Sequence, residues 1–209
     1  MTTTLNINRL LPVTEAEGPG RRTCLWLQGC SRHCEGCFSP HTWDSAPHLL
    51  LSPADIIRQA LDEDVEGLTL LGGEPFEQAE PLAELLRLAW AARLSTVVFT
   101  GFTHEQLIAM EEPYVREVLA HTDVLIDGPY IERLRDFSRP MVGSANQRFI
   151  FLTGRYTMAH FKANRIEIRI LPDGTTAING MGHIEQLACI TGQQSIHTQP
   201  TTSCLHQPS

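Results

Sequence analysis

The chain has 209 residues, of which 42% are apolar, and this composition predicts one globular domain with a hydrophobic core. Its formal net charge of -8 argues against nonspecific binding to nucleic acid or to an anionic membrane, because both depend on excess Lys and Arg. No apolar run approaches the roughly 18 residues of a membrane span, and residues 1–13 lack the features of a signal peptide. We therefore expect a cytoplasmic protein that acts on a protein or a small molecule.

From Arg22 onward, apolar runs of strand length alternate with amphipathic stretches of helical length. The helical stretch that begins near Leu51 has Ser52 as its expected N-cap and Pro53 in its first turn. Continuous apolar strands separated by helices are typical of a parallel sheet buried on both faces, so we predict an α/β fold, specifically a partial (open) βα barrel. Strands are expected at residues 22–29, 67–73, 95–101 and 123–130, and helices at 51–64, 77–93 and 103–110.

The regular alternation weakens after Tyr130. Residues 131–148 are typical of a charged loop, and residues 165–180 predict a β-hairpin around a Pro-Asp-Gly turn. Residues 181–209 are rich in Gln, Ser, Thr, Pro and His and show little apolar pattern. We therefore expect one domain over residues 1–180, followed by a loosely ordered tail over residues 181–209.

Three of the six cysteines, Cys30, Cys34 and Cys37, lie together in the sequence CSRHCEGC. In a reducing compartment this clustering favours metal or cluster ligation over a disulfide scaffold. Three thiolates at these spacings can hold three irons of a 4Fe-4S cubane, because soft sulfur ligands suit iron–sulfur chemistry. A missing fourth thiolate leaves one iron open to chelate the amino and carboxylate groups of S-adenosylmethionine. Transfer of one electron would then cleave a C–S bond and release a 5'-deoxyadenosyl radical.

Structural zinc is the alternative interpretation of these cysteines, with Cys24, His33 or a tail cysteine as the fourth ligand. The nine histidines show no recognised zinc-binding spacing. Cys189 and Cys204 lie in the polar tail and match no cluster spacing. We expect Cys24 to point from its strand into the core.

A second motif, LTLLGGEPF at residues 68–76, places two glycines and a carboxylate at the carboxyl end of a predicted strand. That is where α/β folds bind their ligands. Gly72 and Gly73 lack Cβ atoms, so the backbone could approach a ligand and accept hydrogen bonds from its ammonium group, and Glu74 could add charge complementarity. The structural alternative is a tight strand-to-helix turn with Pro75 at the first helical position.

Together, residues 17–44, 68–76, 97–102, 123–130 and 143–148 resemble the ordered motifs of the radical SAM activating proteins, above all those of anaerobic ribonucleotide reductase. The resemblance spans about two-thirds of the chain. It implies that a 4Fe-4S cluster is bound by Cys30, Cys34 and Cys37. It also implies that the S-adenosyl-L-methionine bound to this cluster is contacted beside it by Gly36, Cys37 and Phe38, and at its methionyl end by Gly72, Gly73, Glu74 and Pro75.

The activity that this resemblance implies is the generation of a glycyl radical on a partner enzyme, with electrons from a low-potential donor such as flavodoxin or ferredoxin. The chain departs from many radical SAM proteins because Gly36 replaces the aromatic residue before the third cysteine, while Phe38 follows it as in the activating subgroup. It also continues well past Arg148. A radical SAM enzyme that modifies a peptide or metabolite directly, and a zinc-stabilised interaction module without enzymatic activity, are the alternatives.

Two further polar residues, Asp127 and Arg148, are expected near the open end of the sheet. Either could contact the cofactor or the partner. Either could equally form ordinary hydrogen bonds within a loop.

Overall fold

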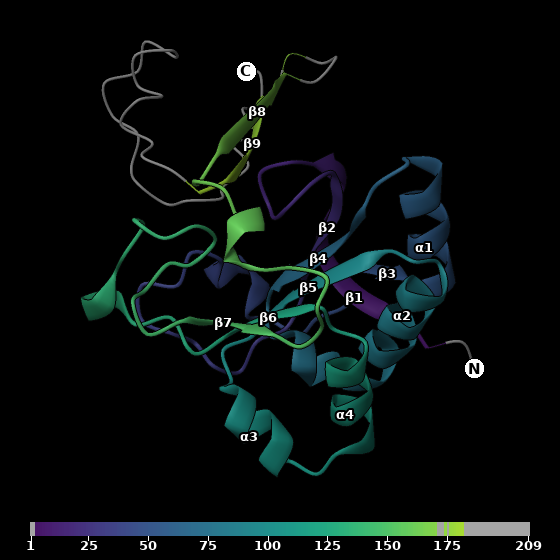
Figure 1. Cartoon of the computed structure of the whole chain (residues 1–209), viewed down its shortest axis with the longest axis horizontal. Coiled ribbons are helices and arrows are strands. Elements are labelled where there is room, and N and C mark those ends of the chain that lie inside the picture. Colours follow the sequence, from purple (N-terminus) through teal and green to yellow (C-terminus); the bar gives the residue numbers. More distant parts are fainter. Residues whose placement is uncertain (1–2, 171–173, 175, 182–209) are drawn as a thin grey trace.

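The computed structural model describes residues 3–170, 174 and 176–181 and contains a seven-stranded sheet with the order β3-β1-β2-β4-β5-β6-β7 (Figure 1). Strands β2, β4, β5 and β6 are parallel, whereas β1, β3 and β7 run antiparallel to their neighbours. The chain is therefore α/β, and its sheet is mixed rather than wholly parallel. The strands of this sheet are β1 (Leu5–Thr14), β2 (Arg22–Leu27), β3 (Leu49–Leu51), β4 (Gly67–Gly72), β5 (Ser95–Phe99), β6 (Val124–Asp127) and β7 (Arg148–Phe151).

Two of the helices begin directly after Ser52 and Thr103, whose side chains cap them. The Ser52 hydroxyl accepts a hydrogen bond from the Asp55 N–H (3.2 Å), and Thr103 forms a capping box with Gln106. The α-helices are α1 (Pro53–Asp62), α2 (Ala79–Ala91), α3 (His104–Ala109) and α4 (Pro113–Ala120). Short 3₁₀ helices are η1 (Pro40–Thr42), η2 (Pro75–Gln78), η3 (Glu132–Leu134) and η4 (Met158–His160).

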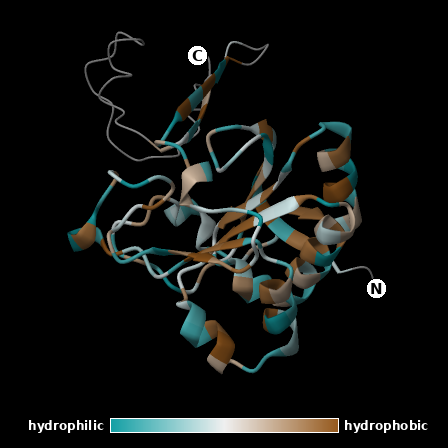
Figure 2. Ribbon diagram, in the orientation of Figure 1, coloured by the Kyte–Doolittle hydropathy of each residue, from teal (hydrophilic) through white to brown (hydrophobic). Residues whose placement is uncertain are grey.

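The main hydrophobic core lies between the helices and one face of the sheet, where brown strands meet the brown faces of the helices in Figure 2. The predicted apolar face of α2, formed by Leu82, Leu85, Leu86 and Ala89, is buried in this core. Because side chains alternate along a strand, the opposite face of the sheet carries separate clusters. One contains Leu11, Trp26 and Cys24, so the predicted burial of Cys24 is confirmed.

Sequence analysis did not predict β1, β3 or α4. The pairing of β1 with β2 shifts register between Ile7 and Arg9 and again between Leu11 and Thr14. Each bulge interrupts the alternation of buried and exposed side chains, so β1 lacks the period of two by which strands are found. Strand β3 has only three residues.

The predicted hairpin is present as a separate two-stranded sheet of β8 (Ile166–Ile170) and β9 (Thr176–Gly180). Cys189 and Cys204 lie outside the described residues, as does the predicted tail except for Met181. No helix in the described part of the chain is long and apolar enough to cross a membrane.

Candidate functional site

A pocket opens at the carboxyl ends of the parallel strands and is lined by Cys30, Cys34 and Cys37 together. The segments that follow β4, β5 and β6 also contribute to it. The two sequence motifs, which are far apart in the chain, therefore share one cavity. Its other lining residues include Gly72, Gly73 and Glu74 after β4, Thr100 and Gly101 after β5, and Gly128 and Tyr130 after β6.

The cysteine loop is held by the chain segment that follows it. The Cys30 N–H donates to the Trp43 carbonyl (3.2 Å), and the ring of His33 stacks on Trp43 with centroids 4.6 Å apart. The Cys37 N–H donates to the Cys34 carbonyl (3.1 Å), which closes a turn through Gly36 at a φ of 70°. All three thiols are free. The loop therefore presents them to the pocket without linking them to one another.

The turn after β4 is fastened to the start of this loop. The N–H groups of Gly73 and Glu74 donate to the carbonyls of Leu27 and Gly29, both at 2.8 Å. A Cβ atom at Gly73 would lie 2.2 Å from the Gly29 carbonyl oxygen. Glycine is therefore required at position 73 because the two motifs approach each other closely there, whether or not a ligand also contacts it.

The Glu74 carboxyl is almost fully buried, with 1% exposure, and has three intramolecular partners. One oxygen accepts from the Thr100 hydroxyl (2.8 Å) and the Phe76 N–H (3.1 Å), and the other accepts from the Gly101 N–H (2.8 Å). Burial raises the pKa of Glu74 to about 7. Glu74 thus joins the ends of β4 and β5 and caps η2, whose first residue is Pro75, as in the structural alternative for this motif.

Arg32 is a charged pocket residue that the sequence analysis missed. Its guanidinium lies 4.5 Å from the centre of the Phe102 ring, and its Nε is buried without a hydrogen-bond partner in the described part of the chain. A buried donor without a partner is costly and indicates a place where a ligand can accept a hydrogen bond. Its position between Cys30 and Cys34 was the only signal available in the sequence.

An aromatic wall, formed by Phe38 and Tyr130, is part of the pocket lining. Phe38 packs against Tyr130, with ring centroids 4.6 Å apart, and both side chains line the cavity. Gly143 allows this approach, since a Cβ atom there would lie 2.6 Å from the Phe38 ring.

Two of the predicted cofactor-binding residues lie outside the pocket lining. Gly36 is exposed and Pro75 is buried, and neither is part of the pocket lining. The others line the pocket: Cys37, Phe38, Gly72, Gly73 and Glu74.

A protein family described as "4Fe-4S single cluster domain" matches residues 16–150 of this chain. The anaerobic ribonucleoside-triphosphate reductase-activating protein of Vibrio cholerae is 30% identical over 153 residues, which cover 68% of this chain and 96% of that protein. The protein of the same name from Haemophilus influenzae is 30% identical over 157 residues, with the same coverage. The chain belongs to the radical SAM activating protein family.

A more distant similarity agrees with this membership. The pyruvate formate-lyase-activating enzyme of Clostridium pasteurianum is 31% identical over 124 residues, which cover 56% of this chain and 49% of that enzyme. The cofactors of this radical SAM activating protein are accordingly a 4Fe-4S cluster and S-adenosylmethionine.

The donor set in this activating protein fits a 4Fe-4S cluster. Each thiolate of a cubane binds a different iron, so the sulfur atoms need only surround a shared cavity, as Cys30, Cys34 and Cys37 do.

Asp127 and Arg148 lie outside the pocket lining and pair with each other. The buried Asp127 accepts from the Arg148 guanidinium (2.5 and 3.0 Å), and it also accepts from the His104 N–H (2.7 Å). The sequence left open whether these two residues contact the cofactor or partner or form hydrogen bonds within the protein. The contacts that they make in the structure are of the second kind.

Glu17 is a second pocket residue that the sequence analysis did not single out for chemistry. It is 4% exposed, and its carboxylate accepts from the Gly180 N–H (2.7 Å). Burial raises the pKa of Glu17 to about 7. It connects the pocket to the hairpin.

Proposed function

We propose that this protein generates a glycyl radical on a partner enzyme of the anaerobic ribonucleotide reductase type. The observation that carries the proposal is the shared pocket, in which three free thiols meet the Gly-Gly-Glu turn at the carboxyl ends of parallel strands. The activating proteins of Vibrio cholerae and Haemophilus influenzae, which this chain matches over 96% of their length, support the choice of partner.

In this proposal Cys30, Cys34 and Cys37 hold the cluster and leave one iron without a protein ligand. When bound, the cluster supplies the electron that cleaves S-adenosylmethionine to the radical that takes a hydrogen atom from the partner's glycine. Burial raises the pKa of the Cys30 thiol, so ligation at its Sγ must displace a proton. Arg32 brings a positive charge to the same cavity.

The remaining predicted cofactor residues would bind S-adenosylmethionine from two sides. Phe38, together with the Gly36 turn, would contact it beside the cluster. Gly72, Gly73 and Glu74 would hold its methionyl end through main-chain groups, because the Glu74 carboxylate already has three partners. Pro75, which is buried outside the pocket lining, would support this end by fixing the turn. The aromatic wall would exclude water from the reacting atoms.

We further infer that residues 1–180 form one radical SAM domain of the open βα barrel type and that residues 181–209 form a tail. The four adjacent parallel strands, with the pocket at their carboxyl ends, support the barrel type. A low-potential one-electron donor such as flavodoxin or ferredoxin would reduce the cluster. Unpaired thiols persist in reducing compartments, which supports a cytoplasmic location.

The test uses protein reconstituted with iron and sulfide without oxygen and then reduced with dithionite. Cleavage of S-adenosylmethionine to 5'-deoxyadenosine is expected, together with a glycyl-radical EPR signal on the anaerobic ribonucleoside-triphosphate reductase encoded in the same genome. Cleavage without any glycyl radical would favour the direct modification of a peptide or metabolite. A protein that bound zinc and no iron would instead be the interaction module.

A further inference from the structure

The β8–β9 hairpin is separate from the large sheet (Figure 1). It begins after the residues 16–150 that the family shares. Its last residue, Gly180, lines the pocket together with Met181 and the three cysteines. The hairpin therefore adds a wall to a pocket whose chemistry is built from the shared part of the chain.

One face of the hairpin is fixed to the body of the protein. Glu167 accepts a hydrogen bond from the Thr14 hydroxyl, and Asn179, which is 1% exposed, donates from its side-chain amide to the same hydroxyl (2.9 Å). The Arg169 guanidinium donates to the Val13 carbonyl. These contacts come from both strands, so they fix the orientation of the hairpin relative to the pocket.

The opposite face is apolar, with Ile168 and Ile170 exposed and Ile166 and Ile178 half-buried. Ile168 is paired directly with Ile178, and paired residues of antiparallel strands project on the same face. Ile166 and Ile170 share this face because side chains alternate along β8. Ile168 is 39% exposed and Ile170 is 80% exposed. A row of isoleucines on an isolated two-stranded sheet is unfavourable in water and is typical of a surface that another molecule covers.

We propose that this isoleucine face of the hairpin, formed by Ile166, Ile168, Ile170 and Ile178, is a docking surface for the glycyl radical enzyme that the protein activates. The inference rests on the proposed function. Because the hydrogen atom is taken from a backbone glycine, a loop of the partner must enter the pocket, and the surface flanking that loop must cover the rim. Gly180 at the end of the hairpin lines the pocket, and Ile166, which is paired with Gly180, begins the isoleucine face that extends from there along β8. The partner's flanking surface meets this face with apolar side chains.

The location of the hairpin beyond the shared region suggests what it contributes. The match to the Vibrio cholerae activating protein covers 96% of that protein but 68% of this chain. The hairpin is thus an addition to the part that carries the cysteines and the Gly-Gly-Glu turn. Its isoleucine face selects this chain's own partner and leaves cofactor cleavage unchanged.

The experiment measures glycyl radical formation against the concentration of the purified anaerobic ribonucleoside-triphosphate reductase encoded in the same genome. The double variant Ile168→Ser with Ile170→Ser is expected to raise the KM for the reductase by about 10-fold, because apolar contacts with the partner are lost. Iron content and cleavage of S-adenosylmethionine without reductase should stay at wild-type values. Leu61→Ser with Ile108→Ser, which changes side chains that are 53% and 55% exposed elsewhere, is the matched control.

An unchanged KM in the double variant, with wild-type protein active on the reductase, would overturn the docking surface and leave the proposed function standing. If wild-type protein cleaved S-adenosylmethionine but formed no glycyl radical on the reductase, the proposed function would fail, and the docking surface with it. If the double variant lost iron, Ile170→Lys alone would decide the question, since a side chain that is 80% exposed is not needed for folding.

Discussion

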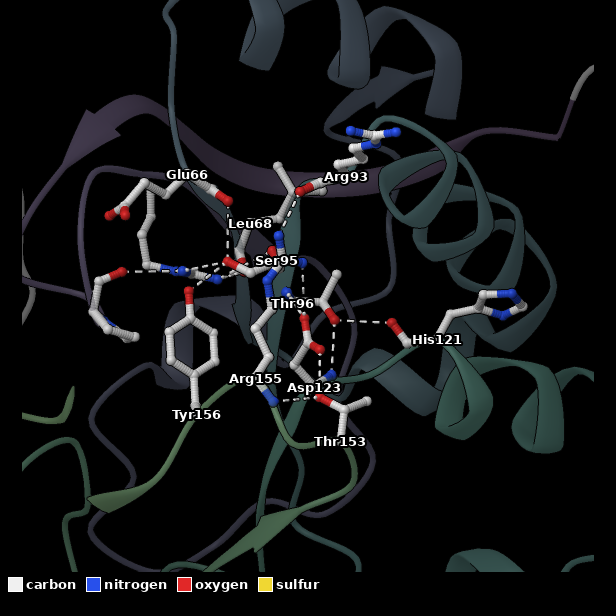
Figure 3. Close-up of polar contacts among 12 residues, drawn as sticks. Glu66, Leu68, Arg93, Ser95, Thr96, His121, Asp123, Thr153, Arg155 and Tyr156 are labelled. Carbon is white, nitrogen blue, oxygen red and sulfur yellow. Dashed lines mark hydrogen bonds and ion pairs between the residues drawn. The ribbon is translucent and has the colours of Figure 1, made fainter. Parts of the chain in front are cut away.

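Both ends of the central parallel strands bury polar groups, but the amino end is closed by protein contacts and the carboxyl end opens into a pocket. At the amino end, Arg22 is fully buried and donates to the Thr69 hydroxyl (2.7 Å), the Ser95 hydroxyl (3.0 Å) and the Leu68 carbonyl (2.5 Å). Ser95 also accepts from the Tyr156 hydroxyl (2.8 Å), as Figure 3 shows. Each of these hydrogen bonds is made between groups of the chain itself.

A second set of contacts at the amino end, drawn in Figure 3, centres on Asp123. This residue is 2% exposed. Its carboxylate accepts from the Thr96 N–H (2.9 Å) and the Thr153 hydroxyl (2.6 Å) and lies 3.5 Å from the Arg155 guanidinium. These contacts join β5 and β6 to the segment after β7. Buried polar groups with complete partners specify a structure and leave little for a ligand to satisfy.

At the carboxyl end, by contrast, the three cysteine thiols form no disulfide and line an open cavity, and the Arg32 Nε there lacks a hydrogen-bond partner among the described residues. The two ends show that burial of polar groups alone does not identify a functional site. The distinguishing feature is a cavity lined by thiols without disulfide partners and by an unpaired buried donor. Barrel-like folds show the same division, with stability at the amino ends of the strands and chemistry at their carboxyl ends.

The largest expected effect lies at the carboxyl end. Cys34→Ala should abolish both normal cluster content and reductive cleavage of S-adenosylmethionine, because two remaining thiolates hold a cluster poorly. Iron and sulfide analysis after anaerobic reconstitution, with product assay, measures both. Folding should be preserved, since the Cys34 thiol makes no disulfide. Cleavage at the wild-type rate would show that Cys34 is not a ligand.

At the amino end, Arg22→Met should lower the free energy of unfolding by about 3 kcal/mol or more, because it leaves several buried acceptors without donors. Urea unfolding measures the loss. Arg58→Met, which removes an exposed guanidinium paired with Asp55, should change the free energy by no more than about 0.5 kcal/mol. Equal effects of the two substitutions would contradict a structural role for the closed end.

Gly73→Ala tests the fastening of the two motifs at the carboxyl end. Its Cβ would lie 2.2 Å from the Gly29 carbonyl oxygen, so the free energy of unfolding should fall by about 1–3 kcal/mol. Cluster content should fall too, because Gly29 directly precedes Cys30. Substitution here therefore cannot separate cofactor binding from cluster assembly.

The control for Gly73→Ala is Gly154→Ala, where a Cβ atom would meet nothing within 4 Å. It should leave stability and iron content at wild-type values. If Gly73→Ala behaved in the same way, the close approach of the two motifs would not matter to the site.

Much of the fold and of the pocket could be predicted from the sequence, because helix caps and apolar runs act locally. Ser52 and Thr103 cap the helices that their positions predict, and the Cys and Gly-Gly-Glu motifs meet in one pocket. The fold at the edges could not be predicted, since the bulges in β1 remove its period of two.

The partners of individual site residues could not be predicted either. The sequence predicts Glu74 as a cofactor-binding residue but does not predict that it accepts hydrogen bonds from groups that follow β5. The contact of Arg32 with Phe102 joins two loops that are distant in the chain. Such contacts depend on how the strand ends are brought together, which no local pattern encodes.

A pH-dependent effect concerns Glu17, which lies between the two ends, with its carbonyl bonded to Thr69 and its carboxyl in the pocket. Burial raises the pKa of this carboxyl from 4.5 to about 7 in the folded protein. Between these values the folded state holds a proton that the unfolded state has lost. Its contribution to stability is therefore complete below about pH 4.5 and is lost as the pH rises through about 7.

Glu17→Gln should remove this contribution while keeping the oxygen that accepts from the Gly180 N–H. The slope that one such group adds is at most about 1.4 kcal/mol per pH unit. Between pH 5 and pH 8 the free energy of unfolding of the cluster-free chain, measured with urea, should fall less in the variant than in the wild type. The part of this fall that is due to Glu74, whose pKa is also raised to about 7, remains in both. Glu15→Gln makes the same change of charge at an exposed position nearby. If the two variants had the same pH dependence, burial would not raise the pKa of Glu17. Water would then reach this carboxyl more freely than its contacts indicate.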